Sequence, residues 1–455
     1  MFELLARAAD RAPSHTAVIH AGTVTSYGDL AESARRIAGE LDSRRIRRFC
    51  IVDPDPTSVL PLLAGASRAG VEACIYPPTA TPDDVAELLD RFDHDLLVTA
   101  RDDLTGLCST VTAAELQEKP YDLIDDALPA ERPHLVLTTG TTGKPRGVRH
   151  DWSRLVRIVD ESRAGTGSGE RWLLAYGMNQ FGGLQVLLHV MGTGATLVGT
   201  ETFQPKEGLA ALREHDVTHA SATPTFWRFL LAELKSDGGE VPPLQQITLG
   251  GEAPNEQVLD ALKGTFTGAQ VTQIYAANEF GKARSVRDAT SGLPLSALTE
   301  DDDVQLKIED GELWVRSAVG MLGYYGEDTI DPDAWRPTGD LVEIVGDRVF
   351  FRGRASDVIN VGGVKVHPLP VEDRVNEVPG VQVARVFGRP NALTGAVVAV
   401  EVVAAPGNDT DEIDAAIRAA CADLPPASRP RSIRFVDEIT TTDHKIIRQS
   451  AEETP

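Results

Sequence analysis

The chain has 455 residues, a hydrophobic fraction of 42% and a formal net charge of −24 at pH 7. This length exceeds that of one compact core and favours a large domain followed by a small one. The negative charge argues against a nucleic-acid partner, because a polyanion would be repelled at long range. The best candidate for a membrane span, residues 61–80, is broken by Arg68 and Glu72, so we expect no membrane partner.

The first twelve residues contain an acidic third residue and no long apolar core, which is not typical of a secretory signal. We therefore expect a cytoplasmic protein. The four cysteines, Cys50, Cys74, Cys108 and Cys421, form no CxxC motif and no pair with histidine. Neither a zinc site nor a disulfide framework is indicated, and buried free thiols are the simplest interpretation.

The first hundred residues alternate between helical and strand patterns. Ser26 and Asp29 precede apolar residues at helical spacing and predict a capped amphipathic helix. Short apolar runs predict strands at residues 49–52, 73–76 and 96–99, with helices at 59–69 and from Thr81 onward. This alternation predicts a layered α/β domain that binds its ligands at the ends of strands.

Residues 135–148, LVLTTGTTGKPRGV, contain the strongest binding signal of the chain. An apolar run is followed by nine residues that are all Thr, Gly, Lys, Pro or Arg. Glycines allow backbone N–H groups to turn inward, while hydroxyl groups and two cations add further attraction for an anion. We predict a phosphate-binding loop made of Thr138, Thr139, Gly140, Thr141, Thr142, Gly143 and Lys144, with Arg146 behind it. The spacing differs from that of the common P-loop, and the alternative is a flexible linker.

Seven further motifs follow along the chain. They are YGMNQFGGLQ (176–185), SATPT (221–225), ITLGGEAP (247–254), IYAANEFG (274–281), PTGD (337–340), RGRASDVINVGGVKVHP (352–368) and TTTDHKIIR (440–448). In content and order, the loop and these motifs resemble the signature of the adenylate-forming superfamily. This superfamily contains acyl-CoA synthetases, aryl-acid ligases, nonribosomal-peptide adenylation domains and luciferases. The resemblance covers nearly the whole chain, from about residue 25 to residue 448.

The resemblance implies an α/β fold in two parts. A large multi-layered N-terminal α/β domain is expected over residues 1–353, and a small mobile α+β C-terminal domain over residues 354–455. The hinge between them would lie near Ser356, where Asp or Lys is more usual in the family. Within the small domain we expect strands at 382–387, 396–403 and 432–436, the last of them final, and a helix at 411–424.

The resemblance also implies roles for individual residues. The Thr/Gly loop would hold the triphosphate and Glu279 would bind Mg²⁺, which prefers carboxylate oxygen. Asp340 and Arg354 would contact the ribose and the nucleotide, and Lys445 would be the catalytic lysine that bridges carboxylate and α-phosphate. The remaining contacts to ATP are expected from Gly251, Glu252, Ala253, Tyr275, Ala276 and Asn278, with Tyr275 stacked on the adenine.

The acid pocket is expected to be formed by Gln180, Phe181 and Gly250. Gln180 stands where the family usually has histidine, and a pair of amides that caps a helix is an equally good interpretation of Asn179 and Gln180. Other departures from the family pattern are Ala276 and Asn278 in the tyrosine motif and His444 before Lys445.

These roles imply ATP-dependent activation of a carboxylic acid through an acyl-adenylate, with release of pyrophosphate and transfer of the acyl group to a thiol. We expect an acyl- or aryl-CoA ligase, because no aspartate that could bind an α-ammonium group lies near Phe181. One alternative is a stand-alone adenylation enzyme that loads an acid or an amino-type acid onto a phosphopantetheinyl carrier protein. Another is a nucleotide-binding protein without catalysis. Arg429, Arg431 and Arg434 could meet either thiol carrier, although a solvated edge is the simpler interpretation.

Overall fold

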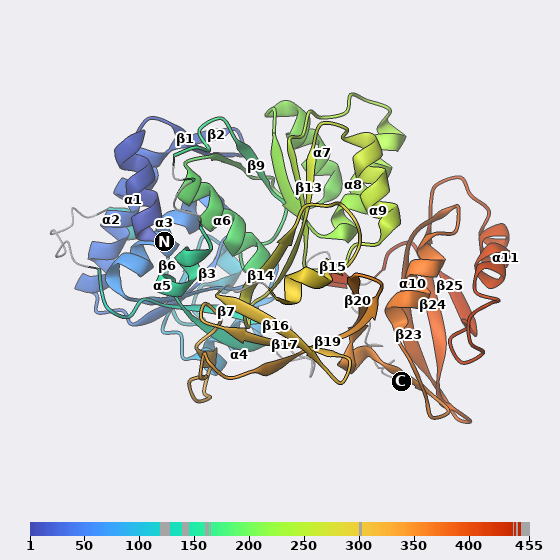
Figure 1. The fold of residues 1–455 in the computed structure, drawn as a ribbon. Coiled ribbons are helices and arrows are strands. Elements are labelled where there is room, and N and C mark those ends of the chain that lie inside the picture. Colours follow the sequence, from blue (N-terminus) through green and yellow to red (C-terminus); the bar gives the residue numbers. More distant parts are fainter. Residues whose placement is uncertain are drawn as a thin grey trace.

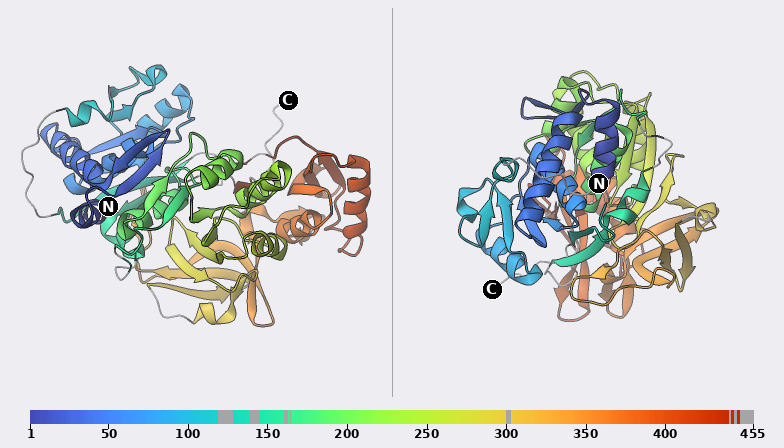
Figure 2. Two further views of the ribbon diagram at one scale, coloured as in Figure 1. Left: turned by 90° about the horizontal axis from the view of Figure 1, so that it is seen from above. Right: turned by 90° about the vertical axis from the view of Figure 1, so that its left-hand side faces the viewer.

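The computed structural model has two lobes, a large one that holds the chain as far as β20 and a small one at the C-terminal end (Figures 1 and 2). It describes residues 1–118, 128–138, 145–159, 163, 165–299 and 303–439, and the backbone of 441–442 and 445–446. The expected fold class, a large layered α/β part followed by a small α+β part, is confirmed. No helix among the described residues combines the length and apolar character needed to cross a membrane.

The first layer of the large lobe is a sheet of seven strands in the order β18-β8-β7-β4-β3-β5-β6. The strands are β3 (Arg48–Val52), β4 (Glu72–Ile75), β5 (Leu96–Thr99), β6 (Ser109–Val111), β7 (Pro133–Thr138), β8 (Arg146–Asp151) and β18 (Gly323–Tyr324). One face packs on α1 (Phe2–Arg11), α2 (Tyr27–Ser43) and α3 (Pro56–Ala69), and the other packs on α4 (Pro82–Phe92). A short helix, α5 (Trp152–Leu155), follows β8.

Two helices of this layer begin at the predicted caps. The Ser26 side chain accepts a hydrogen bond from the Asp29 backbone N–H, and the Asp29 carboxylate accepts one from Ser26 N, which completes a capping box. Thr81 and Asp84 form the same box at the start of α4. These predictions are confirmed because a cap depends on residues only three positions apart.

The second layer is a sheet of eight strands in the order β14-β13-β12-β11-β9-β10-β1-β2. The strands are β1 (Thr16–His20), β2 (Thr23–Ser26), β9 (Arg171–Leu174), β10 (Thr196–Val198), β11 (His219–Ala222), β12 (Gln246–Gly250), β13 (Gln270–Ala277) and β14 (Gly281–Val286). One face buries apolar side chains against α7 (Pro205–Glu214), α8 (Pro224–Asp237) and α9 (Glu256–Thr265). On the opposite side, α6 (Phe181–Thr193) shares a core with β9 and with α1.

The third sheet of the large lobe has five strands in the order β15-β20-β19-β17-β16. They are β15 (Leu293–Pro294), β16 (Val304–Glu309), β17 (Glu312–Ser317), β19 (Arg336–Val345) and β20 (Arg348–Arg354). Strands β19 and β20 form an antiparallel hairpin with its turn at Gly346. The last strand ends at Arg354, and a short 3-10 turn, Ala355–Asp357, leads into the small lobe. Ser356, the predicted hinge residue, lies in this turn.

The small lobe is a sheet in the order β22-β21-β24-β23, to which β25 is added beside β24. Its elements are β21 (Ile359–Val361), β22 (Val364–Val366), α10 (Pro368–Asn376), β23 (Val381–Asn391), β24 (Gly395–Ala404), α11 (Thr410–Ala420) and β25 (Ser432–Phe435). We expected β25 to be the last strand of the chain. This expectation is wrong, since β26 (Thr441–Thr442) pairs with β27 (Lys445–Ile446) beyond it. The helix predicted to reach residue 424 ends at Ala420.

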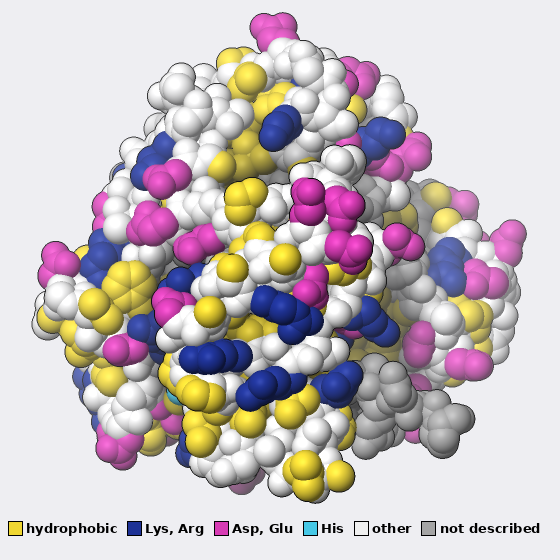
Figure 3. Space-filling model, turned by 90° about the vertical axis from the view of Figure 1, so that its right-hand side faces the viewer, with side chains coloured by type: hydrophobic (Ala, Val, Ile, Leu, Met, Phe, Trp, Pro, Cys, Tyr) yellow, Lys and Arg dark blue, Asp and Glu magenta, His cyan; other side chains and the backbone are white. Residues whose placement is uncertain are grey.

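The surface around the small lobe mixes both signs of charge. Figure 3 shows Lys and Arg side chains gathered near the centre of that face, with acidic side chains around them. Arg429, Arg431 and Arg434 are all exposed. Arg434 pairs with Glu401 of β24, so part of this positive charge is already compensated within the lobe.

Candidate functional site

A cavity of about 1780 Å³ lies among the three sheets of the large lobe, extends beneath α6 and reaches the small lobe. Every residue that the sequence predicted for the nucleotide and acid sites, and whose side chain is described, lines this cavity. These residues are Thr138, Gln180, Phe181, Gly250, Gly251, Glu252, Ala253, Tyr275, Ala276, Asn278, Glu279, Asp340 and Arg354. The structure therefore brings together side chains that are more than two hundred positions apart in the chain. Their individual roles stay predictions.

The Thr/Gly loop itself lies largely outside the described residues, namely at Thr139, Gly140, Thr141, Thr142, Gly143 and Lys144. Its two ends are described, because Thr138 of β7 pairs with Arg146 of β8. The loop therefore joins two antiparallel strands at the edge of the cavity. The backbone of Lys445 belongs to β27, and its side chain is outside the described part.

Asp340 is held by two neighbours from different elements. Tyr275 of β13 donates its hydroxyl to Oδ2 at 2.7 Å, and Arg354 Nε lies 2.9 Å from Oδ1. Burial raises the pKa of Asp340, while the Arg354 guanidinium opposes this shift. Burial and the nearby Asp340 charge raise the pKa of the Tyr275 hydroxyl well above its ordinary value, so it remains a donor. A carboxylate fixed in this way still has lone pairs for the hydroxyl groups of a ribose.

Glu279 faces Tyr324, whose hydroxyl donates to Glu279 Oε1 at 3.3 Å. Burial and Glu279 raise the pKa of Tyr324 to about 12. The Arg146 guanidinium lies 3.4 Å from the centre of the Tyr324 ring and pairs with Glu327 at 2.7 Å. Glu327 thus partly compensates the positive charge of Arg146, which we had assigned to the phosphate loop.

Arg336, at the start of β19, is a cation that sequence reasoning missed. It lines the cavity, and its Nε and Nη1 atoms are buried without a hydrogen-bond partner among the described residues. Burial lowers the pKa of Arg336, whereas Tyr324 and Glu279 act in the opposite direction. Because an unpaired buried charge is costly, these donors suit an anionic ligand. A lone arginine beside a proline carries no sequence signal for such a role.

A second missed residue is His150 of β8. Its Nε2 lies 2.6 Å from Asn278 Oδ1, and its ring stacks on Phe181 at 5.8 Å. Burial lowers the pKa of His150 to about 4, so the ring is neutral at pH 7 and donates its Nε2 proton to the amide oxygen. This bond directs the amino group of Asn278 away from His150. His150 is therefore a positioning residue for Asn278, which stands where the family usually has threonine.

The start of α6 forms the wall of the predicted acid pocket. Gln180 is the residue before the first helical turn, and its side chain makes no capping hydrogen bond, although it lines the cavity. The capping interpretation of this amide is therefore wrong. Tyr176 donates its hydroxyl to the carbonyl oxygen of Gly250 at 3.2 Å, which joins the turn before α6 to the end of β12.

Mg²⁺ fits this site only if the phosphates of a bound nucleotide supply most of its ligands. The described residues contain no cluster of three or more His, Cys, Asp or Glu side chains that could hold a metal ion alone. Mg²⁺ that is bound by phosphates usually keeps several waters and needs only one or two protein carboxylates. Glu279 supplies one carboxylate in the cavity.

Comparison with known proteins identifies the family of this chain. The family model of the AMP-binding enzymes matches residues 5–325, and that of the AMP-binding enzyme C-terminal domain matches residues 370–445. A feruloyl-CoA synthase from Amycolatopsis is 28% identical, with 96% of this chain and 95% of the relative covered. A 4-chlorobenzoate–CoA ligase from Arthrobacter is 27% identical, with 96% and 92% covered.

A solved structure shows the same fold. The o-succinylbenzoate-CoA synthetase of Bacillus subtilis, in complex with its acyl-adenylate intermediate, has a TM-score of 0.79 and 21% identity, with 98% of this chain and 96% of that chain covered. The two lobes thus share the fold of that synthetase. The chain belongs to the AMP-binding enzyme family, whose model matches well over half of its residues.

Proposed function

We propose that this protein is an ATP-dependent acid–thiol ligase. It activates a carboxylic acid as an acyl-adenylate, releases pyrophosphate and transfers the acyl group to coenzyme A. The observation that carries this proposal is the convergence of Glu279, Asp340, Arg354 and the base of the Thr/Gly loop on one cavity. The relatives named above, a feruloyl-CoA synthase and a 4-chlorobenzoate–CoA ligase, support the same reaction class.

The chemistry explains why two anions must be brought together. A carboxylate does not react with a thiol, because its carbonyl carbon is electron-rich and oxide is too poor a leaving group. Attack of the carboxylate on the α-phosphorus of ATP converts that oxygen into part of AMP, which then leaves when the thiol attacks. Catalysis of the first step rests mainly on alignment of the reactants and neutralisation of charge.

The residues of the cavity divide these tasks. The Thr/Gly loop and Arg336 hold the phosphates, and Asp340 and Arg354 hold the ribose end of the nucleotide. Asn278, oriented by His150, donates to the α-phosphate or to the acid. Lys445 is the cation between carboxylate and α-phosphate. Mg²⁺ would enter with ATP next to Glu279 and reduce the repulsion between the phosphates.

The experiment that tests the proposal measures pyrophosphate release from ATP over a panel of aryl, alkyl and amino acids, and then offers either coenzyme A or a holo carrier protein as the acceptor. We expect release with a non-amino acid and transfer to coenzyme A. Glu279→Gln should abolish release, while Glu309→Gln, an exposed glutamate on β16, should not change it. Binding of ATP without release for any acid would contradict the proposal, and transfer only to the carrier protein would correct the acceptor.

A further inference from the structure

The cavity extends beyond the proposed nucleotide site along one face of the second sheet. Consecutive residues of a strand point to opposite faces. Ala220, Ala222, Ile247, Leu249 and Val271 pack in the core beneath α7, α8 and α9. On the other face, Gly250 and Ile274 line the cavity together with five polar residues: His219, Ser221, Gln246, Thr248 and Thr272. We call this set the polar floor.

A polar floor is unusual for these strands. Parallel strands covered on both faces are normally apolar throughout, and buried polar groups are costly unless they are hydrogen-bonded. Part of the floor satisfies itself, since Gln246 Nε2 donates to Thr272 Oγ1 at 2.8 Å and to Thr248 Oγ1 at 3.2 Å. An alkyl chain on this surface would gain little. An acid with its own oxygen atoms would replace the hydrogen bonds to water that it loses on binding.

Helix α6 covers the floor with two polar side chains. Gln185 and His189 are four residues apart, so they lie on the same face of the helix, and both line the cavity. Gln185 Nε2 and His189 Nε2 are buried and make no hydrogen bond within the described part of the chain, although His189 Nε2 lies 3.9 Å from Glu170 Oε2, an ion-pair distance that is too long for a hydrogen bond. These two nitrogens leave hydrogen bonds available to a ligand.

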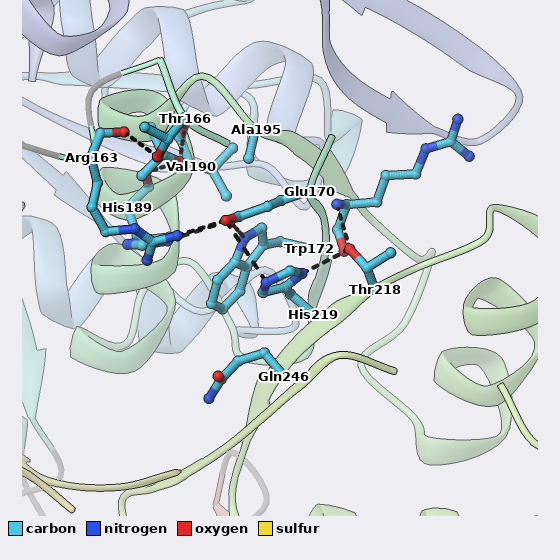
Figure 4. Close-up of polar contacts among 12 residues, drawn as sticks. Arg163, Thr166, Glu170, Trp172, His189, Val190, Ala195, Thr218, His219 and Gln246 are labelled. Carbon is cyan, nitrogen blue, oxygen red and sulfur yellow. Dashed lines mark hydrogen bonds and ion pairs between the residues drawn. The ribbon is translucent and has the colours of Figure 1, made fainter. Parts of the chain in front are cut away.

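The far end of the cavity is an aromatic cluster around Trp172 (Figure 4). The Trp172 ring lies 4.7 Å from the His189 ring and 4.9 Å from the His219 ring. Trp172 Nε1 donates to Glu170 Oε2 at 2.9 Å, and Arg163 pairs with Glu170 Oε1 at 2.6 Å. The cluster is thus held in place by a carboxylate that lies behind it.

Glu170 and Arg163 form an ion pair within this cluster. Burial would raise the pKa of Glu170, but His189, Trp172, His219 and Arg163 outweigh it and lower the pKa to about 2, so Glu170 is an anion that balances Arg163. Burial lowers the pKa of His219, which keeps that ring neutral at pH 7. Neither a second carboxylate nor an ammonium group would find an uncompensated opposite charge here.

The strand register sets the length of ligand that would reach the cluster. Gln246 and Gly250 stand on the same face of β12, four residues apart, which corresponds to about 13 Å along the strand. His219 is the register partner of both Gln246 and Trp172, so the aromatic cluster lies level with Gln246. An acid whose carboxylate lies near Gly250 therefore needs a body longer than one aromatic ring to touch His189.

We propose that the acid substrate is elongated and carries an uncharged oxygen-bearing group, a hydroxyl or a carbonyl, at the end remote from its carboxylate. This group binds Gln185 and His189 above the polar floor. This inference rests on the proposed ligase activity, because that activity requires the carboxylate of the acid to lie next to the nucleotide.

The test compares four biphenyl-4-carboxylic acids that differ only at the 4′ position: hydroxyl, methyl, carboxylate and aminomethyl. Both the Kd of each acid, by calorimetry, and kcat/KM for pyrophosphate release are measured. We expect the hydroxyl acid to be favoured over the methyl acid by about tenfold, the value of one good hydrogen bond. Gln185→Leu and His189→Leu should reduce this ratio to about one. His215→Leu, a histidine that does not line the cavity, should leave the ratio unchanged.

Several results would overturn the inference. They are equal or better binding of the methyl acid, preference for either charged acid, binding of none of the four, or an unchanged ratio in both leucine variants. The two measurements keep this failure separate from that of the proposed function. Preference for the hydroxyl acid in Kd without pyrophosphate release would contradict the ligase and support the pocket. Pyrophosphate release without any preference for the hydroxyl acid would support the ligase and contradict the pocket.

Discussion

The hydrogen bond between His150 and Asn278 joins the first sheet to the nucleotide cavity. Replacement of His150 by Leu should leave the Asn278 amide without a partner and lower the free energy of unfolding by about 1–3 kcal/mol. Pyrophosphate release should fall as well. If His150 acts through Asn278, His150→Leu and Asn278→Ala should be non-additive for kcat by about 0.5–3 kcal/mol.

The matched control for this cycle is His134→Leu. His134 is also buried and is the register partner of His150, with its ring packed 4.5 Å from that of Trp152. This variant should lose stability, yet its effect on kcat should add to that of Asn278→Ala. Equal coupling for both histidines would mean that His150 has only a structural role.

Arg336 should act mainly on ATP. Because its buried donors have no partner among the described residues, Arg336→Met should raise KM for ATP by about tenfold or more and should not lower stability. The control is Arg316→Met on the neighbouring strand β17, where the guanidinium bonds to Gln305 and does not line the cavity. A normal KM in Arg336→Met would show that the phosphates lie elsewhere.

Glu170 should make stability depend on pH in the acid range. Its pKa is about 2 in the folded protein, below the ordinary value of 4.5, so the unfolded chain binds more protons between these values. The stability that Glu170 contributes is complete above about pH 4.5 and is lost as the pH falls towards 2. The difference in unfolding free energy between wild type and Glu170→Gln should therefore shrink on acidification. The exposed Glu214→Gln should show no such trend.

At the scale of elements, the first turn of α6 depends on a close approach between backbones. A Cβ atom at Gly183 would overlap the carbonyl of Gly177 and lie 2.9 Å from its carbon. Gly183→Ala should therefore displace the turn that carries Gln180, lower stability by about 1–3 kcal/mol and raise KM for the acid.

The control substitution is Gly264→Ala in α9, where a Cβ atom would meet nothing within 4 Å. Because alanine loses less backbone entropy in a helix, this variant should be neutral or gain about 0.5–1 kcal/mol. Urea unfolding of both variants measures the difference. A stable Gly183→Ala variant with normal KM would show that the turn tolerates the shift.

Local signals predicted the starts of α2 and α4 well, because a helix cap depends on residues only a few positions apart. The motifs also predicted which described residues would line the cavity. The Asn278–His150 pair was missed because its partners are 128 residues apart and a lone histidine in a strand has no pattern. The polar floor did have a signal, the alternation in HASA and QITLG, which becomes informative only when both faces of those strands are known to be covered.

At the scale of the whole molecule, the chemistry is expected to use both lobes. Lys445 belongs to the segment beyond the small sheet, and the turn at Ser356 links the lobes. We expect Lys445→Ala to lose adenylate formation by a factor of about a thousand or more, because the bridging cation is absent. Thiolysis of a supplied acyl-adenylate should fall far less.

The control for this experiment is Lys235→Ala, an exposed lysine at the end of α8 that does not line the cavity. It should leave both half-reactions unchanged. Equal losses of both half-reactions in Lys445→Ala would contradict a model in which the small lobe turns between the two steps.

The two-faced construction of β11 and β12 has a consequence for how this enzyme could acquire new substrates. Ala220, Ala222, Ile247 and Leu249 pack in the core behind the sheet, while the intervening positions line the cavity in which we propose that the acid binds. Variation at the intervening positions can therefore explore new acids without disturbing the buried helices behind them. A combinatorial library confined to residues 219, 221, 246 and 248 should retain a high proportion of folded members and still diverge in the compounds that it accepts.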